Sequence, residues 1–342
     1  MPRSVGRVAL VLGAAMAVVG GLAWCSAAPA GAVAVRPTDM RSSVVAVEPA
    51  APVEIRIIGG DALVELTVQP GHEVIVAGYD DEPYLRISPD GTVATNRRSP
   101  ATGLNRSWTP SDPDAADASA TAPPDWLVTG SGGRAVWHDH RIHAAEVTQP
   151  IAWTLLLTVD GTRTEVHGEL RHLDPPSPLP WLALAAACAL AAWFGGRHHP
   201  QVASLASVFV AALLATVTGT IEWASVPSGT GRALGVVLLP VAALVLSMLA
   251  MVMRRSSIRL VLTLGAISLL AGWLAFRWAN LTHRVLVTDL LPAVDRAVLA
   301  AVLGLVVASA GLALAGTGSA DDVGGSGDAG AGAPREASPT EA

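Results

Sequence analysis

The chain has 342 residues, of which 51% are hydrophobic and 15% are charged, and its mean hydropathy is +0.47. Because an ordinary soluble domain carries about 25% charged residues, this composition argues against a soluble enzyme. The net charge of −6 is unevenly placed: residues 33–178 hold 11 arginines against 20 acidic residues, or −9, so nucleic acid is not an expected partner, since phosphate binding needs positive charge.

The first 32 residues have the order of a secretory signal. Arg3 and Arg7 precede an apolar stretch from Val8 to Ala23, and small residues follow it. We expect residues 1–32 to be a signal peptide or, if they are not cleaved, a membrane anchor. In both cases the segment that follows lies outside the cell membrane.

Residues 33–178 show short strand-like runs broken by Gly, Pro and Asp. Alternating apolar and β-branched residues predict strands at 53–58, 62–68, 72–77, 84–88, 92–96, 126–129, 134–138, 151–159 and 162–170. Asp160-Gly161 is a tight hairpin signal between the last two strands. The pattern predicts an extracytoplasmic antiparallel β-sandwich with a mobile loop near residues 109–124.

Residues 179–316 are strongly apolar and predict a transmembrane domain of about five helices. A helix needs about 20 apolar residues to cross the hydrocarbon layer. The predicted spans are 180–195, 201–221, 233–253, 258–276 and 297–315. The fold class is therefore α+β by segments, with the β-sandwich followed by a five-helix transmembrane α-bundle.

The topology follows from an outer domain and five spans. Arg197 and the cluster of Arg254, Arg255 and Arg259 then lie on the cytoplasmic side, in agreement with the positive-inside rule. Residues 317–342 are rich in Gly, Ala and Asp and predict a disordered cytoplasmic tail. The segment 280–296 is expected to lie along the outer membrane surface and to touch the β-domain.

The densest chemical signal is the run Trp137-His138-Asp139-His140-Arg141-Ile142-His143. On a strand, His138 and His140 share a face, and a turn at Arg141 would bring His143 beside them. Three neutral imidazoles suit Cu(II) and, less well, Zn(II). The alternative is a polar strand end whose histidines only form hydrogen bonds.

A second group of polar residues lies between residues 78 and 105 and holds both tyrosines of the chain. Together with neighbours of the histidines, it supplies the candidates for orienting a metal ligand or forming a partner surface. These are Asp139, Arg141, Trp137, Tyr79, Tyr84, Arg86 and Asn96. For this second group we favour the structural alternative, in which the tyrosines are core aromatics and Asn96 is a turn former.

Common catalytic motifs are missing from the sequence. It holds no Gly-rich phosphate loop, Gly-x-Ser-x-Gly elbow or His-Glu-x-x-His pair, so we predict that the protein is not an enzyme. Cys25 and Cys188 both lie in apolar runs and predict no disulfide. Ionisable residues are missing near the predicted bilayer centre, which argues against coupled transport.

These residues resemble a family of uncharacterised actinobacterial integral membrane proteins with an extracytoplasmic β-domain. The resemblance rests on Trp137-His138-Asp139-His140-Arg141 with His143, and on Glu82-Pro83-Tyr84-Leu85-Arg86. Members of that family are often encoded near copper-handling secreted proteins, which implies a metal role and a secreted metal-handling protein or another membrane protein as partner. Where the family tends to continue the motif with Trp and Met, this chain has Ala144 and Ala145, which disfavours Cu(I) relative to Cu(II).

The leading hypothesis is a multi-pass cell-membrane protein whose outer domain, residues 33–178, binds a transition metal through His138, His140 and His143. Copper is favoured, and the role would be metal handling or envelope homeostasis. The alternative is a membrane-anchored protein-interaction or assembly module that binds no metal. A second alternative is a transporter component. All three place the helices in a lipid bilayer.

Overall fold

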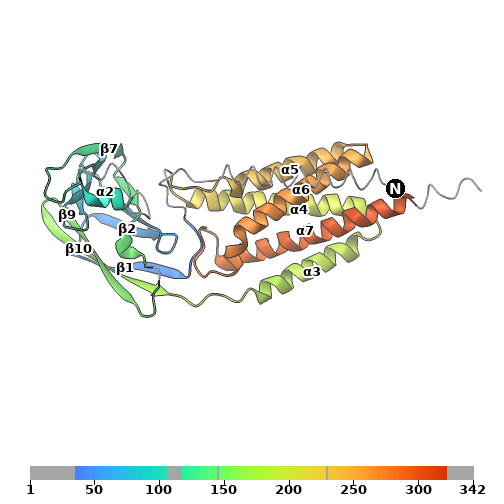
Figure 1. Ribbon diagram of the computed structural model, residues 1–342, viewed down its shortest axis with the longest axis horizontal. Coiled ribbons are helices and arrows are strands. Elements are labelled where there is room, and N and C mark those ends of the chain that lie inside the picture. Colours follow the sequence, from blue (N-terminus) through green and yellow to red (C-terminus); the bar gives the residue numbers. More distant parts are fainter. Residues whose placement is uncertain (1–34, 106–117, 145, 229, 322–342) are drawn as a thin grey trace, which may run out of the picture.

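The computed structural model describes residues 35–105, 118–144, 146–228 and 230–321. Figure 1 shows a β-rich domain at one end of the molecule and long helices that run side by side away from it. The predicted signal segment, residues 109–117 of the predicted loop, and the tail beyond Asp321 lie outside the described residues.

Within the described residues, ten strands form two sheets, and every strand pair is antiparallel. The larger sheet has the order β1-β10-β9-β4-β5-β6-β7, and the smaller has the order β2-β3-β8. The strands are β1 (Met40–Glu48), β2 (Val53–Ile58), β3 (Leu63–Val68), β4 (Val74–Ala77), β5 (Pro83–Ile87), β6 (Val93–Asn96), β7 (Trp126–Gly130), β8 (Arg134–Trp137), β9 (Ile151–Val159) and β10 (Thr162–His172).

Strand β1 is the one that the sequence pattern did not predict. Its register against β10 shifts between Val44 and Ala46, so the alternation of side chains is broken in the middle of the strand. The other nine strands were predicted, with ends within two residues of those observed. Asp160 and Gly161 both have positive φ, at 48° and 81°, as the predicted two-residue hairpin between β9 and β10 requires.

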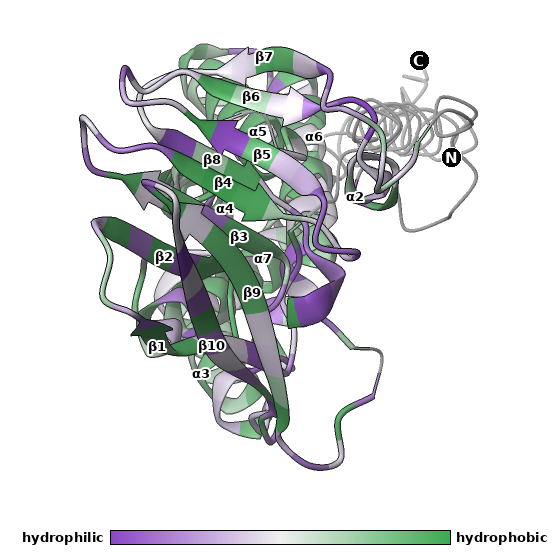
Figure 2. Cartoon of the chain, turned by 90° about the vertical axis from the view of Figure 1, so that its left-hand side faces the viewer, coloured by the Kyte–Doolittle hydropathy of each residue, from purple (hydrophilic) through white to green (hydrophobic). Residues whose placement is uncertain are grey.

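One apolar core receives side chains from both sheets. Val64 and Leu66 of β3 pack in the same cluster as Ile87 of β5 and Leu155 and Leu157 of β9, and all five are almost completely buried. Figure 2 shows β4 as a largely hydrophobic strand, whereas hydrophilic residues lie in the loops and along parts of β5 and β10. Because the two sheets share one core, neither can bury its apolar face without the other.

Gly168 makes room for Trp153, which lies directly opposite on the neighbouring strand. A Cβ on Gly168 would lie 2.0 Å from Cζ2 of the indole, which is buried. We therefore expect Gly168→Ala to displace Trp153 and to lower the free energy of unfolding by about 1–3 kcal/mol, measured by thermal unfolding of the full chain in detergent. Gly130→Ala is the control, because its Cβ would meet only ordinary contacts at 3.6 Å. Equal losses in the two variants would contradict this explanation.

Five helices follow the β-domain, and all are long and apolar enough to cross a membrane. They are α3 (Leu179–Gly196), α4 (Pro200–Ser225), α5 (Gly235–Val252), α6 (Ser256–Arg277) and α7 (Pro292–Asp321). The five predicted spans are therefore present, and the chain is a multi-pass membrane protein. Helix α7 begins before the predicted residue 297 and continues past the predicted boundary at residue 316.

The segment between α6 and α7 contacts the start of the β-domain. Thr38 and Val285 exchange two backbone hydrogen bonds of 3.1 and 2.9 Å in an isolated antiparallel bridge. Asp39 reinforces the bridge, because its Oδ1 accepts a hydrogen bond of 2.6 Å from the backbone N–H of Arg284. The predicted contact between residues 280–296 and the β-domain is thus confirmed.

Candidate functional site

The histidine run leaves its strand earlier than the sequence pattern predicted. Strand β8 ends at Trp137, and His140–Ile142 forms a single 3₁₀ turn, η2. Asp139 caps this turn by accepting a hydrogen bond of 3.0 Å from the backbone N–H of Arg141. The prediction that His138 and His140 share a strand face is therefore wrong in its geometry, because an Asp before a turn satisfies backbone donors that a strand would leave to its neighbour.

The turn nevertheless brings the three imidazoles together. The ring centres of His138 and His140 lie 4.9 Å apart, with one ring edge-on to the other. The ring centres of His138 and His143 lie 6.1 Å apart. His138 is 3% exposed, whereas His143 at the end of the turn is partly exposed.

Two consecutive residues of the β2–β3 turn orient the outer two histidines of the run. His138 donates from Nδ1 to the carbonyl of Ala62 at 2.7 Å, and His143 donates from Nδ1 to Oδ2 of Asp61 at 2.6 Å. A carbonyl and a carboxylate can only accept, so each ring carries its proton on Nδ1 and its lone pair on Nε2 when neutral. This is the arrangement by which proteins orient a histidine that ligates a metal.

Burial also sets the charge of His138, the first histidine of the run. Loss of solvation lowers the pKa of His138 below its usual range, and the neighbouring His140 and His143 lower it further. His138 is therefore neutral at pH 7, which is the form that can act as a ligand.

The three imidazoles do not yet form a complete ligand set in this conformation. Among the described residues, no group of three or more His, Cys, Asp or Glu side chains is placed to hold a metal ion. Two other histidines of the β-domain have separate partners, since His72 bonds to Asp160 at 2.6 Å and His167 lies 3.4 Å from the hydroxyl of Thr154, and His172 lies at the end of β10. Any metal site here consequently depends on His138, His140 and His143.

The contacts of Asp139 and Arg141 hold the histidine run against the rest of the β-domain. Asp139 is 1% exposed, and its Oδ2 accepts from Nε1 of Trp137 at 2.9 Å and from Arg141 at 2.8 Å. Burial opposes ionisation of Asp139, but the hydrogen bonds and charge of Arg141 outweigh it and hold the pKa of Asp139 below its usual range. Arg141 also donates to the carbonyls of Ala77 and Gly78, which fixes the turn against the end of β4.

Tyr79 joins the second polar group to the histidines. Its hydroxyl donates to Oδ1 of Asn105 at 2.5 Å and accepts from the backbone N–H of His140 at 2.9 Å. The guanidinium of Arg141 lies 4.9 Å from the centre of the Tyr79 ring. Burial raises the pKa of Tyr79, so its hydroxyl remains a donor. The two polar groups that are separate in sequence therefore form one site.

The other candidate residues have structural contacts. Tyr84 is buried edge-on against Trp137, with ring centres 6.4 Å apart. Asn96 donates to the carbonyl of Pro83 at 2.7 Å. Arg86 pairs with Glu73 at 2.6 Å instead of with the site.

Sequence reasoning missed the contacts of Asp61 and Ala62 with the histidines, and it named Glu82 without assigning it a contact. Asp61 belongs to a Gly-Gly-Asp turn and is separated from His143 by more than 80 residues, so no spacing rule connects them. Glu82 is buried and accepts a hydrogen bond of 2.5 Å from Ser99. A Cβ on Gly78 would lie 2.0 Å from Oε1 of Glu82, which explains why a glycine precedes Tyr79.

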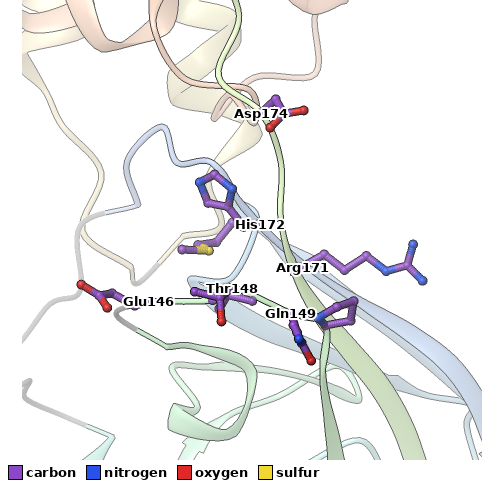
Figure 3. Close-up of a pocket in the computed structure, with 9 residues that line it drawn as sticks. Glu146, Thr148, Gln149, Arg171, His172 and Asp174 are labelled. Atoms are coloured by element: carbon purple, nitrogen blue, oxygen red, sulfur yellow. The ribbon is translucent and has the colours of Figure 1, made fainter.

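A hollow of about 730 Å³ lies beside the loop that follows the histidines. Figure 3 shows its labelled side chains, in which Asp174, Arg171 and Glu146 lie apart, at three different sides of the hollow. These charged groups do not converge on a common point, so the hollow is not the better candidate site.

The chain was compared with known protein families, curated proteins and solved structures, and none matches it.

Proposed function

We propose that the β-domain is an antiparallel sandwich on the outer side of the cell membrane and that it binds a transition metal through His138, His140 and His143. Cu(II) is the preferred ion, and Zn(II) the next. The observation that carries the proposal is the anchoring of two Nδ1 atoms by Asp61 and Ala62, which leaves Nε2 as the ligand atom of both rings. A role in metal handling or envelope homeostasis follows from this site.

The distances support a site that is partly assembled. Imidazole ligands bind at about 2 Å, so two rings on one ion have centres about 5 Å apart. The 4.9 Å between His138 and His140 meets this condition, and the 6.1 Å between His138 and His143 is wider. Neutral imidazoles are suitable ligands for a positively charged transition-metal ion.

Burial weighs against the alternative that these motifs form a partner surface. Asp139, Asn96 and Tyr84 are all less than 5% exposed, so their side chains are occupied within the domain. A protein-interaction role would therefore have to use other residues.

The proposal predicts metal binding that depends on the three histidines. Cu(II) is titrated into the full chain in detergent by calorimetry, after removal of metal with a chelator. We expect His140→Gln and His143→Gln each to weaken binding at least about tenfold, and the triple variant with His138→Gln to abolish it. His72→Gln is the matched control, because His72 also bonds to an aspartate but lies elsewhere.

Asp61→Asn tests the orienting role separately. An amide at this position can donate as well as accept and no longer fixes the proton on Nδ1 of His143, so the affinity for Cu(II) should fall about 10- to 100-fold while the melting temperature changes little. Unchanged affinity in the triple histidine variant, with its fold retained by circular dichroism, would overturn the proposed function.

A further inference from the structure

A cleft lies where the β-domain faces the loops of the helices. Its volume is about 380 Å³, and its walls come from β2 and β8 on one side and from the α4–α5 and α6–α7 connections on the other. The charged residues that line it are Arg56, Glu65, Arg134, Arg232 and Asp289. A neighbouring hollow of about 460 Å³ shares Arg134 and two residues of the α4–α5 connection.

Positive charge exceeds negative charge in this cleft. Three arginines face two carboxylates, which gives a formal net charge of +1. Glu65 is only 4% exposed and is contacted by Arg134 and, at 3.7 Å, by Arg56. Its charge is thus already compensated by two guanidiniums, both of which remain substantially exposed.

Arg232 is held in place by the helix end. Its Nε donates to the carbonyl of Val226 at 2.7 Å, and its guanidinium lies 4.4 Å from the centre of the Trp223 ring. These contacts orient the guanidinium through its Nε atom and through the face that lies over the Trp223 ring. A pre-oriented guanidinium of this kind recognises phosphate by paired N–H···O bonds.

The cleft lies at the level where the membrane-spanning helices end. Ser225 is the last residue of α4, and its hydroxyl accepts a hydrogen bond of 2.9 Å from the backbone N–H of Asp289. Trp223 lies two residues before this end, a position typical of the aromatic belt at the headgroup region. A ligand of the cleft can therefore come from the lipid surface as well as from solution.

We propose that this cleft binds a phosphate-bearing anion through Arg56, Arg134 and Arg232. The site is independent of the histidines and of any metal they bind. Two sources share the required chemistry, the headgroup of an anionic phospholipid and a soluble phosphate.

The test uses the full chain in detergent with added phosphatidylglycerol, phosphatidylcholine or inorganic phosphate. Lipid retention is read by native mass spectrometry and phosphate binding by calorimetry. We expect Arg56→Gln combined with Arg232→Gln to weaken binding of the anionic ligand about tenfold or more, without changing phosphatidylcholine retention. Arg134 is left intact because its removal would leave Glu65 without its close partner.

Arg163→Gln is the matched control, since Arg163 is as exposed as Arg56 and also lies near a glutamate, at 3.5 Å. Loss confined to phosphatidylglycerol supports a lipid ligand, and loss of inorganic phosphate binding supports a soluble one. The proposal is overturned if the double variant melts like the unmodified chain and binds both anions as well as Arg163→Gln does. Because no metal is needed in this assay, its failure would leave the histidine proposal untouched.

Discussion

Replacing Asp139 with alanine is expected to lower the free energy of unfolding by about 3–5 kcal/mol, because it removes one partner of a buried ion pair. Asp139 accepts hydrogen bonds from Trp137 and from both the backbone and the side chain of Arg141. Without it, the guanidinium of Arg141 stays between the carbonyls of Ala77 and Gly78 and loses its hydrogen-bonded countercharge. Thermal unfolding of the full chain, followed by near-ultraviolet circular dichroism, measures the loss.

Asp125→Ala is the matched control for this effect. Asp125 also pairs with an arginine, Arg97, at 2.6 Å, but both side chains are exposed to solvent. Exposed pairs contribute about 0–1 kcal/mol, so the control should lose little. Similar losses in Asp139→Ala and Asp125→Ala would show that the buried pair does not clamp the histidine run.

The strands could be predicted because one buried face imposes a period of two. Burial alternates in this way along β8, β9 and β10, and the positive φ of Asp160 and Gly161 was implied by their residue types. Strand β1 was hidden by its irregular register at Val44 and Ala46. Local patterns fail where a strand gains its partner late in the chain, as β1 does with β10.

The candidate site could be predicted only in its local part. The run from Trp137 to His143 predicts clustered imidazoles. In the structure the ring centres of His138 and His140 lie 4.9 Å apart, and those of His138 and His143 lie 6.1 Å apart. The partners that orient them, Asp61 and Ala62, belong to a turn that looks ordinary in sequence. The turn and the run come together because β3 pairs with β8 in the smaller sheet, and this long-range pairing leaves no spacing to detect.

The helices could also be predicted from local sequence, whereas the contacts between residues that are distant in sequence could not. Apolar runs predict five spans, but Asp295 and Arg296 interrupt the last run and moved its predicted start to residue 297. In the structure α7 begins at Pro292, and both side chains have partners within the protein. Asp295 pairs with Arg277, and Arg296 donates to the carbonyl of Asn280 at 2.9 Å.

Removing the arginine of this buried group should destabilise the helix bundle strongly. Arg277 is 1% exposed and contacts Asp295 and Glu222, each at 2.6 Å. Arg277→Met keeps the length of the side chain but leaves two carboxylates facing each other where water is scarce. We expect a loss of about 3–5 kcal/mol, seen as a lower melting temperature of the full chain in detergent.

A triple variant separates charge from packing. Adding Asp295→Asn and Glu222→Gln to Arg277→Met removes both stranded charges, so most of the lost stability should return, because a buried ion pair is seldom better than a neutral replacement of similar volume. Arg284→Met is the control for loss of an exposed arginine on the adjacent loop. If the triple variant melts no higher than Arg277→Met, then Arg277 acts mainly through its packing against the Trp273 ring, whose centre lies 5.0 Å from its guanidinium carbon.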